Sequence, residues 1–191
     1  MSGSSWVSQF PNSTSTADLA DGFRQNAESF ISAMETAGAT VDVSSTLRPP
    51  ERAYLMHYSY AIAKEGLDPA QVPAMAGVNI DWVHKKADGS ADLAASKTAA
   101  AQMVSGYGIV FKPALTSRHT EGHAIDMTIS WSGNLNIKNA SGASVNITGG
   151  TRNGSNTQLI QVGATYVGGK SRPSGTGADS SGHGNHEELG T

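Results

Sequence analysis

A histidine and an aspartate on either side of a glycine, His119, Gly122 and Asp126, are the residues in this chain best suited to chemistry. The alternating run 124–129 predicts a strand whose apolar side chains share one face, with Asp126 on the opposite face. Gly122 allows a tight turn that would bring His119 beside Asp126, so that an imidazole nitrogen and a carboxylate oxygen converge on one metal ion. The chain contains no cysteine, so any metal must be held by histidine and carboxylate.

The wider segment 117–126, SRHTEGHAID, resembles the Ser-x-His-x-x-Gly-x-Ala-x-Asp signature of the D-Ala-D-Ala metallopeptidases. That family includes zinc D,D-carboxypeptidases, D,D-dipeptidases and phage L-alanyl-D-glutamate endolysins. The resemblance implies one Zn²⁺ ion held by His119, Asp126 and a histidine near the C-terminus, with an open position for water. It also implies that Ser117 positions the substrate or braces the ligands.

A second match lies upstream, at Ser45-Thr46-Leu47-Arg48. It resembles the family's strand-end segment, whose arginine contacts the substrate and stabilises the oxyanion, and Arg48 takes that position. A guanidinium between a strand and a helix can be directed into a cleft, where fixed donors act most strongly on developing negative charge. We therefore expect Arg48 to bind substrate and to act in catalysis.

The third ligand and the general base are expected in the tail, where the sequence departs from the family pattern. The family has an acidic residue three places before its final histidine, whereas Asp179 precedes His183 by four places. We expect His183 to be the third ligand and Asp179 the base. The alternative is that His186 binds the metal and His183 serves as base. His123 shares its strand face with apolar residues, which favours packing over metal binding.

Apolar spacing predicts the elements that would position these residues. Helices are expected over 18–37, 50–66, 92–105 and 156–167, strands over 40–46, 108–112 and 124–131, and a hairpin over 135–147. The sum is an α+β fold in which N-terminal helices pack on a small antiparallel sheet that carries the single zinc site. We expect a flexible segment 1–16 and one peptidase domain 17–191, which includes a Gly/Ser-rich tail 168–191.

Composition argues against some classes of partner and cellular location. The formal net charge is -3, which argues against nucleic-acid binding. No apolar run approaches the roughly 20 residues of a membrane-spanning helix, and the first residues lack a Sec-type signal. A monomer that acts on the bacterial cell wall after lysis, injection or another route of export is therefore expected, such as a phage or prophage lysin or an effector.

The resemblance implies a zinc metallopeptidase that hydrolyses a peptide bond in the peptidoglycan stem peptide. D,D-carboxypeptidases, D,D-dipeptidases and L-Ala-D-Glu endopeptidases share these side chains, so the motifs do not select the bond that is cut. The alternative is a catalytically impaired cell-wall or zinc-binding module of the same fold. A structural domain without zinc is a third interpretation.

Overall fold

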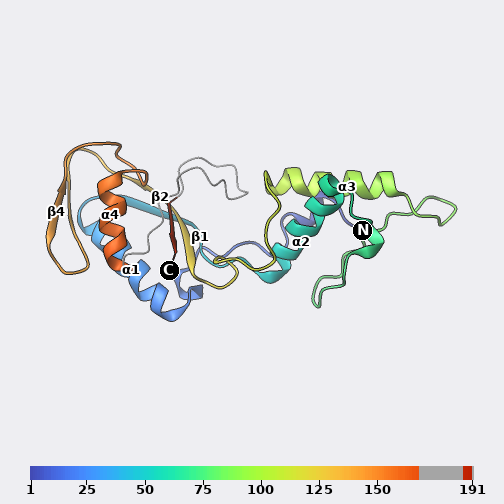
Figure 1. Cartoon of the computed structure of the whole chain (residues 1–191), viewed down its shortest axis with the longest axis horizontal. Coiled ribbons are helices and arrows are strands. Elements are labelled where there is room, and N and C mark those ends of the chain that lie inside the picture. The colour runs from blue at the N-terminus through green and yellow to red at the C-terminus, as the bar shows by residue number, and fades with distance from the viewer. Residues whose placement is uncertain (168–186, 191) are drawn as a thin grey trace. The chain divides into compact units, whose positions relative to one another are not determined.

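The computed structural model describes residues 1–167 and 187–190, the latter for their backbone (Figure 1). Contacts divide these residues into two compact units. Unit 1 holds residues 1–11 and 49–116, and unit 2 holds residues 12–48, 117–167 and 187–190. The sequence predicted a flexible segment 1–16 followed by one domain; the structure assigns the first part of that segment to unit 1 and the rest to unit 2.

Unit 1 is built around two helices, α2 (Pro50–Tyr60) and α3 (Leu93–Tyr107). Pro50 stands in the first turn of α2, which continues into a π-helical turn, Ala61–Glu65, that ends where Gly66 adopts a left-handed conformation. The side chain of Asp92 caps α3 by accepting the N–H of Ala95. Short helical turns lie at Ser4–Trp6 and Pro69–Gln71. The core of unit 1 joins both helices with Val78, Trp82 and Ile109.

The strand expected over 108–112 is wrong. Gly108 ends α3 with a φ of +67°, and the residues that follow form no strand. Ile109 folds back into the core, whereas Val110 and Phe111 are 54% and 59% exposed. The apolar run therefore has no partner strand among the described residues, and its side chains divide between core and solvent.

Unit 2 combines two helices with two antiparallel sheets. The central sheet has the order β1-β2-β5, and β3 and β4 form a separate hairpin. The bounds are α1 (Asp21–Thr36), β1 (Thr40–Ser45), β2 (Ala124–Ser130), β3 (Leu135–Lys138), β4 (Ser144–Ile147), α4 (Thr157–Tyr166) and β5 (Glu187–Gly190). A helical turn, Thr16–Asp18, precedes α1. The expected helices, the strands 40–46 and 124–131 and the hairpin are thus confirmed, as is the α+β class.

The core of unit 2 lies between α1, α4 and the apolar faces of the strands. Phe30 and Met34 of α1, Ile125 and Met127 of β2 and Leu159 of α4 are fully buried in it. Figure 1 shows α1 and α4 together on the side of unit 2 where the β3–β4 hairpin lies. Burial of these apolar faces sets the register of β2 and thereby directs its alternate side chains away from the core.

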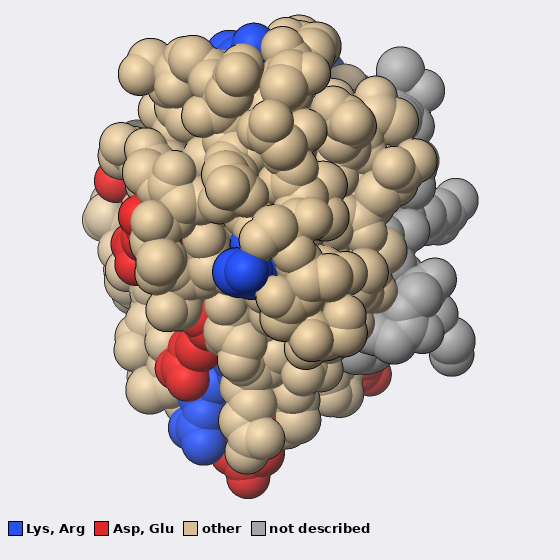
Figure 2. Space-filling model, turned by 90° about the vertical axis from the view of Figure 1, so that its left-hand side faces the viewer, with Lys and Arg blue, Asp and Glu red and all other residues tan. Residues whose placement is uncertain are grey.

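One face of unit 2 carries little charge. Figure 2 shows this face with uncharged residues over most of its area and with acidic and basic side chains few and scattered. Residues 131–167 contain only Lys138 and Arg152 as charged side chains. Among the residues that the structure describes, no helix is both long and apolar enough to cross a membrane.

Candidate metal centre

Strand β2 presents Asp126 on the side of the sheet opposite the core. Its neighbours Ile125 and Met127 are 0% exposed, whereas the Asp126 side chain retains 14% exposure. Asp126 pairs with Ser45 at the end of β1, directly after an irregularity in the ladder between Val43 and Ser45. Such irregularities redirect side chains next to functional sites. The end of β1 and the start of β2 therefore meet at the carboxylate.

His119 lies in a compact turn, 117–123, that leads into β2. The Oγ1 of Thr120 accepts the N–H of Ser117 at 2.7 Å and donates to the Ser117 carbonyl at 2.8 Å. Gly122 completes the turn with a φ of +71°, a conformation that favours glycine. Ser117 thus braces the turn through its backbone, and its hydroxyl accepts the N–H of Thr120 at 3.3 Å.

The ring of His119 is held in a defined orientation. It is 4% exposed, and its Nδ1 donates to the carbonyl of Thr46 at 3.1 Å. Because a carbonyl only accepts, Nδ1 carries the proton, and Nε2 is the nitrogen that lies 3.5 Å from Oδ1 of Asp126. Burial alone would lower the pKa of His119, but the adjacent Asp126 carboxylate and the Thr46 carbonyl outweigh it and raise the pKa.

Arg48 adjoins this pair. It follows β1 directly and is 6% exposed, and its backbone N–H donates to the carbonyl of His119 at 2.9 Å. The positive charge of Arg48 acts to lower the pKa of His119, against the larger effect of Asp126. The structure thus brings together Arg48, His119 and Asp126, three residues that the sequence assigned to one site.

The distance between His119 and Asp126 fits joint binding of a metal ion. Two ligand atoms each about 2.0–2.2 Å from a tetrahedral zinc ion lie about 3.3–3.6 Å apart. A direct charge-assisted hydrogen bond would be about 2.7–2.9 Å long. The observed 3.5 Å between Nε2 and Oδ1 falls in the first range. No third His, Cys, Asp or Glu joins them among the described residues. The other expected residues, Asp179, His183 and His186, lie outside the described part of the chain.

The sequence did not reveal the supports of this site. Thr46 lies within the matched segment, yet nothing in its type indicates that its carbonyl orients His119. Residues 12–20 were expected to contribute a flexible end and the start of a helix, but they hydrogen-bond to Thr46, Leu47 and Gly122. Backbone contacts of this kind have no sequence signature because any residue type supplies the same N–H and C=O groups.

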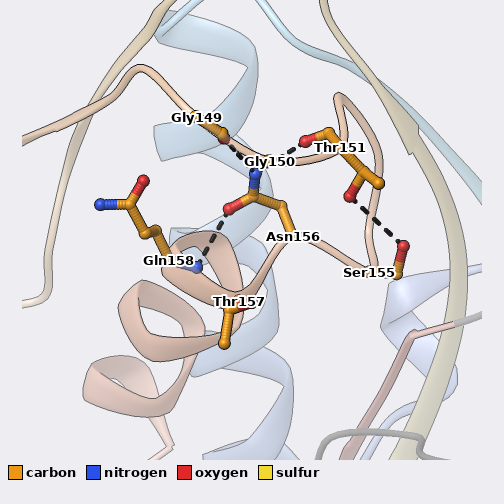
Figure 3. Close-up of a pocket in the computed structure, with 7 residues that line it drawn as sticks. All are labelled: Gly149, Gly150, Thr151, Ser155, Asn156, Thr157 and Gln158. Atoms are coloured by element: carbon orange, nitrogen blue, oxygen red, sulfur yellow. Dashed lines mark hydrogen bonds between the residues drawn. The ribbon is translucent and has the colours of Figure 1, made fainter.

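Unit 2 also contains a cavity of about 410 Å³ at the start of α4, drawn in Figure 3. None of the expected site residues lines it. The Nδ2 of Asn156 donates to the carbonyls of Gly149 and Thr151, and its Oδ1 caps α4 by accepting the N–H groups of Gln158 and Leu159. These hydrogen bonds account for the buried asparagine as a structural cap.

The arrangement at His119 and Asp126 can supply two oriented ligands beside a buried arginine. Such a set suits metal-assisted chemistry on a substrate that develops negative charge. Comparison with protein-family models, with curated proteins and with solved structures found no match for this chain.

Proposed function

We propose that this chain is a zinc-dependent peptidase of the peptidoglycan stem peptide. The observation that carries the proposal is the 3.5 Å separation of His119 Nε2 and Asp126 Oδ1 at an oriented, buried imidazole. The resemblance of residues 117–126 to the D-Ala-D-Ala metallopeptidase signature supplies the substrate class. Arg48, a buried arginine in the position of the family's substrate arginine, is the third feature that supports the proposal.

In this proposal His119 and Asp126 hold the ion together with His183 or, in the alternative, His186. A zinc ion supplies a bound water whose pKa falls to about 7. Asp179 would serve as the general base of that chemistry, or His183 would if His186 is the ligand. Strand β5 pairs with β2 in register with Asp126, and its first residue follows His186 directly in the sequence. Chain connectivity thus favours a tail histidine as the remaining ligand.

Arg48 stabilises the oxyanion that forms at the scissile carbonyl. A guanidinium held out of bulk water interacts more strongly with developing charge than a solvated one. Its rigid fork also recognises the carboxylates of a stem peptide. Ser117 braces the turn that carries His119 through its hydrogen bonds with Thr120.

Metal binding tests the first half of the proposal. Calorimetric titration of the metal-free chain with Zn²⁺ should show one site, and His119→Ala and Asp126→Asn should each weaken it by at least about 100-fold. His123→Gln is the matched control, because His123 lies in the same segment and packs edge-on against Phe23 at 6.5 Å. Zinc binding that survives both ligand substitutions would contradict the proposed centre.

Hydrolysis tests the second half. Peptidoglycan digested with the chain should release stem-peptide fragments that mass spectrometry identifies, and the masses will name the bond that is cut. Chelation should abolish the reaction and added zinc should restore it. Arg48→Lys should lower kcat/KM while leaving zinc affinity unchanged, since lysine lacks the bidentate fork. A chain that binds zinc yet releases no fragment would overturn the peptidase proposal in favour of a binding module.

A further inference from the structure

We propose that residues 12–20, here called the N-terminal strap, are a positioning element of the metal centre. The strap holds the carbonyl that orients His119 and also holds the end of the turn that carries this histidine. The inference rests on the proposed zinc site. The strap contacts the residues that support His119, and no strap residue is assigned a contact with metal or substrate.

The first anchor of the strap is the segment after β1. The N–H of Ser13 donates to the carbonyl of Leu47 at 2.9 Å, and the N–H of Thr46 donates to the carbonyl of Ser13 at 2.8 Å. The Oγ1 of Thr46 donates to the carbonyl of Ser15 at 3.0 Å. Thr46 is 0% exposed, so its own ends of the two bonds that it makes are shielded from water. The carbonyl that accepts Nδ1–H of His119 is therefore fixed from the strap side.

The second anchor is the turn itself. The N–H of Ala20 donates to the carbonyl of Gly122 at 3.0 Å. A Cβ atom added at Gly122 would lie 3.0 Å from the Ala20 nitrogen and 3.2 Å from the Asp18 carbonyl oxygen, so the two backbones are in close contact. The strap thus contacts both supports of His119: Thr46, whose carbonyl accepts the Nδ1–H bond, and Gly122, at the end of the turn.

The strap is itself held in place. The hydroxyl of Ser13 donates to Asp18 Oδ2 at 2.6 Å, and the hydroxyl of Thr16 donates to Glu28 Oε1 of α1 at 2.8 Å. These bonds join the strap to itself and to a helix of the unit 2 core. A support of this kind transmits the rigidity of the core to the ligand.

The chemical consequence lies in the tautomer of His119. A proton on Nδ1 leaves the lone pair on Nε2, the nitrogen that faces Asp126 and the one a metal would take. Loss of the orienting acceptor lets the ring exchange its proton between both nitrogens and rotate. Removing an outer-shell partner of this kind lowers metal affinity by about 10- to 100-fold.

Two substitutions release the two anchors separately. Thr46→Val keeps the shape of the side chain and removes its bond to Ser15, while Thr46→Ser retains the hydroxyl and serves as the rescue. Ala20→Pro removes the N–H that binds Gly122 and places the proline Cδ against that carbonyl, so the contact is broken; the φ of -59° at Ala20 and the extended backbone of Leu19 are otherwise compatible with proline. Thr98→Val removes an exposed helix hydroxyl in unit 1 and is the matched control.

Two readouts are measured on the full chain. Long-range ¹H–¹⁵N spectra of metal-free protein, above the pH at which the ring titrates, report which nitrogen of His119 is protonated. Calorimetry with Zn²⁺ reports affinity. We expect an Nδ1–H tautomer in the wild type, Thr46→Ser and Thr98→Val, mixed tautomers in Thr46→Val, and about 10- to 100-fold weaker zinc binding in Thr46→Val and Ala20→Pro.

Wild-type tautomer and affinity in both Thr46→Val and Ala20→Pro would overturn the inference. Circular dichroism checks that each variant is folded, and the two anchors are independent, so loss of one variant to misfolding leaves the other to decide. If the wild type binds no zinc, the proposed function fails, while the tautomer of His119 still shows whether the strap orients the ring.

Discussion

Replacing Gly122 by alanine tests the close packing behind the His119 turn. Its φ of +71° alone costs an alanine about 1–2 kcal/mol, offset by about 0.4–1 kcal/mol from the less flexible unfolded chain. The new Cβ would also press on backbone atoms of Ala20 and Asp18, at 3.0 and 3.2 Å, which cannot rotate away. Overpacking of this kind adds about 1–3 kcal/mol. We expect Gly122→Ala to destabilise the chain by about 1.5–4 kcal/mol in total.

Gly133→Ala is the control, because Gly133 has a φ of +67° and a Cβ atom added there would meet none of the described residues within 4 Å. It shares the backbone strain without the overlap, so we expect a loss of about 0.5–1 kcal/mol. Urea unfolding followed by circular dichroism measures both variants. Equal losses in the two would refute the close approach of the strap to the turn, and with it the packing that we infer around His119.

Three further predictions concern parts of the chain away from the metal centre. Burial raises the pKa of Tyr107 to about 12 against a smaller lowering by the charge of Arg52, so the folded chain holds this proton more tightly than the unfolded chain. Stability should therefore fall as pH rises from about 10 to 12, and Tyr107→Phe should make that decline shallower in denaturant titrations at each pH. Asn156→Ala removes the cap of α4 and leaves the Thr151 carbonyl without its donor, while the Gly149 carbonyl keeps its bond from Arg152, so urea unfolding should show a loss of about 1–3 kcal/mol, whereas a loss below about 0.5 kcal/mol would contradict the cap. Glu65→Gln removes a partly exposed ion pair with Lys112 and should cost less than about 1 kcal/mol by the same assay, with a larger loss showing that the pair is shielded from solvent.

The elements with strong apolar periodicity could be predicted from the sequence. The helix around Phe23 and Phe30 and the strand around Met127 each bury the face that their spacing indicates. The start of α2 follows from Pro50 and the end of its π-helical turn from Gly66, whose backbone preferences are local, whereas α3 continues past the predicted end at 105 and stops at Gly108. Local rules therefore sufficed wherever one element buried one regular face.

Predictions failed where pairing between distant segments decides the structure. The run 108–112 has strand-forming residues but no partner strand among the described residues, whereas β5 has little apolar alternation and pairs with β2. Residues 12–15 show the same limit, because their Ser/Thr-rich composition indicates a loop and does not encode backbone bonds to Thr46 and Leu47. The sequence indicated that His119 and Asp126 could bind a metal. It did not indicate which backbone carbonyl orients the ring of His119.

Residues 49–116 form one excursion of the chain out of unit 2, and the residues around His119 lie at its two ends. The chain leaves unit 2 after Arg48 and returns at Ser117, and the hydrogen bond from the Arg48 N–H to the His119 carbonyl joins the two ends of that excursion. Closing a longer loop costs only about 0.6 kcal/mol per doubling of its length. A change in the length of 49–116 therefore costs unit 2 little loop-closure entropy, and the residues that orient His119 keep their partners.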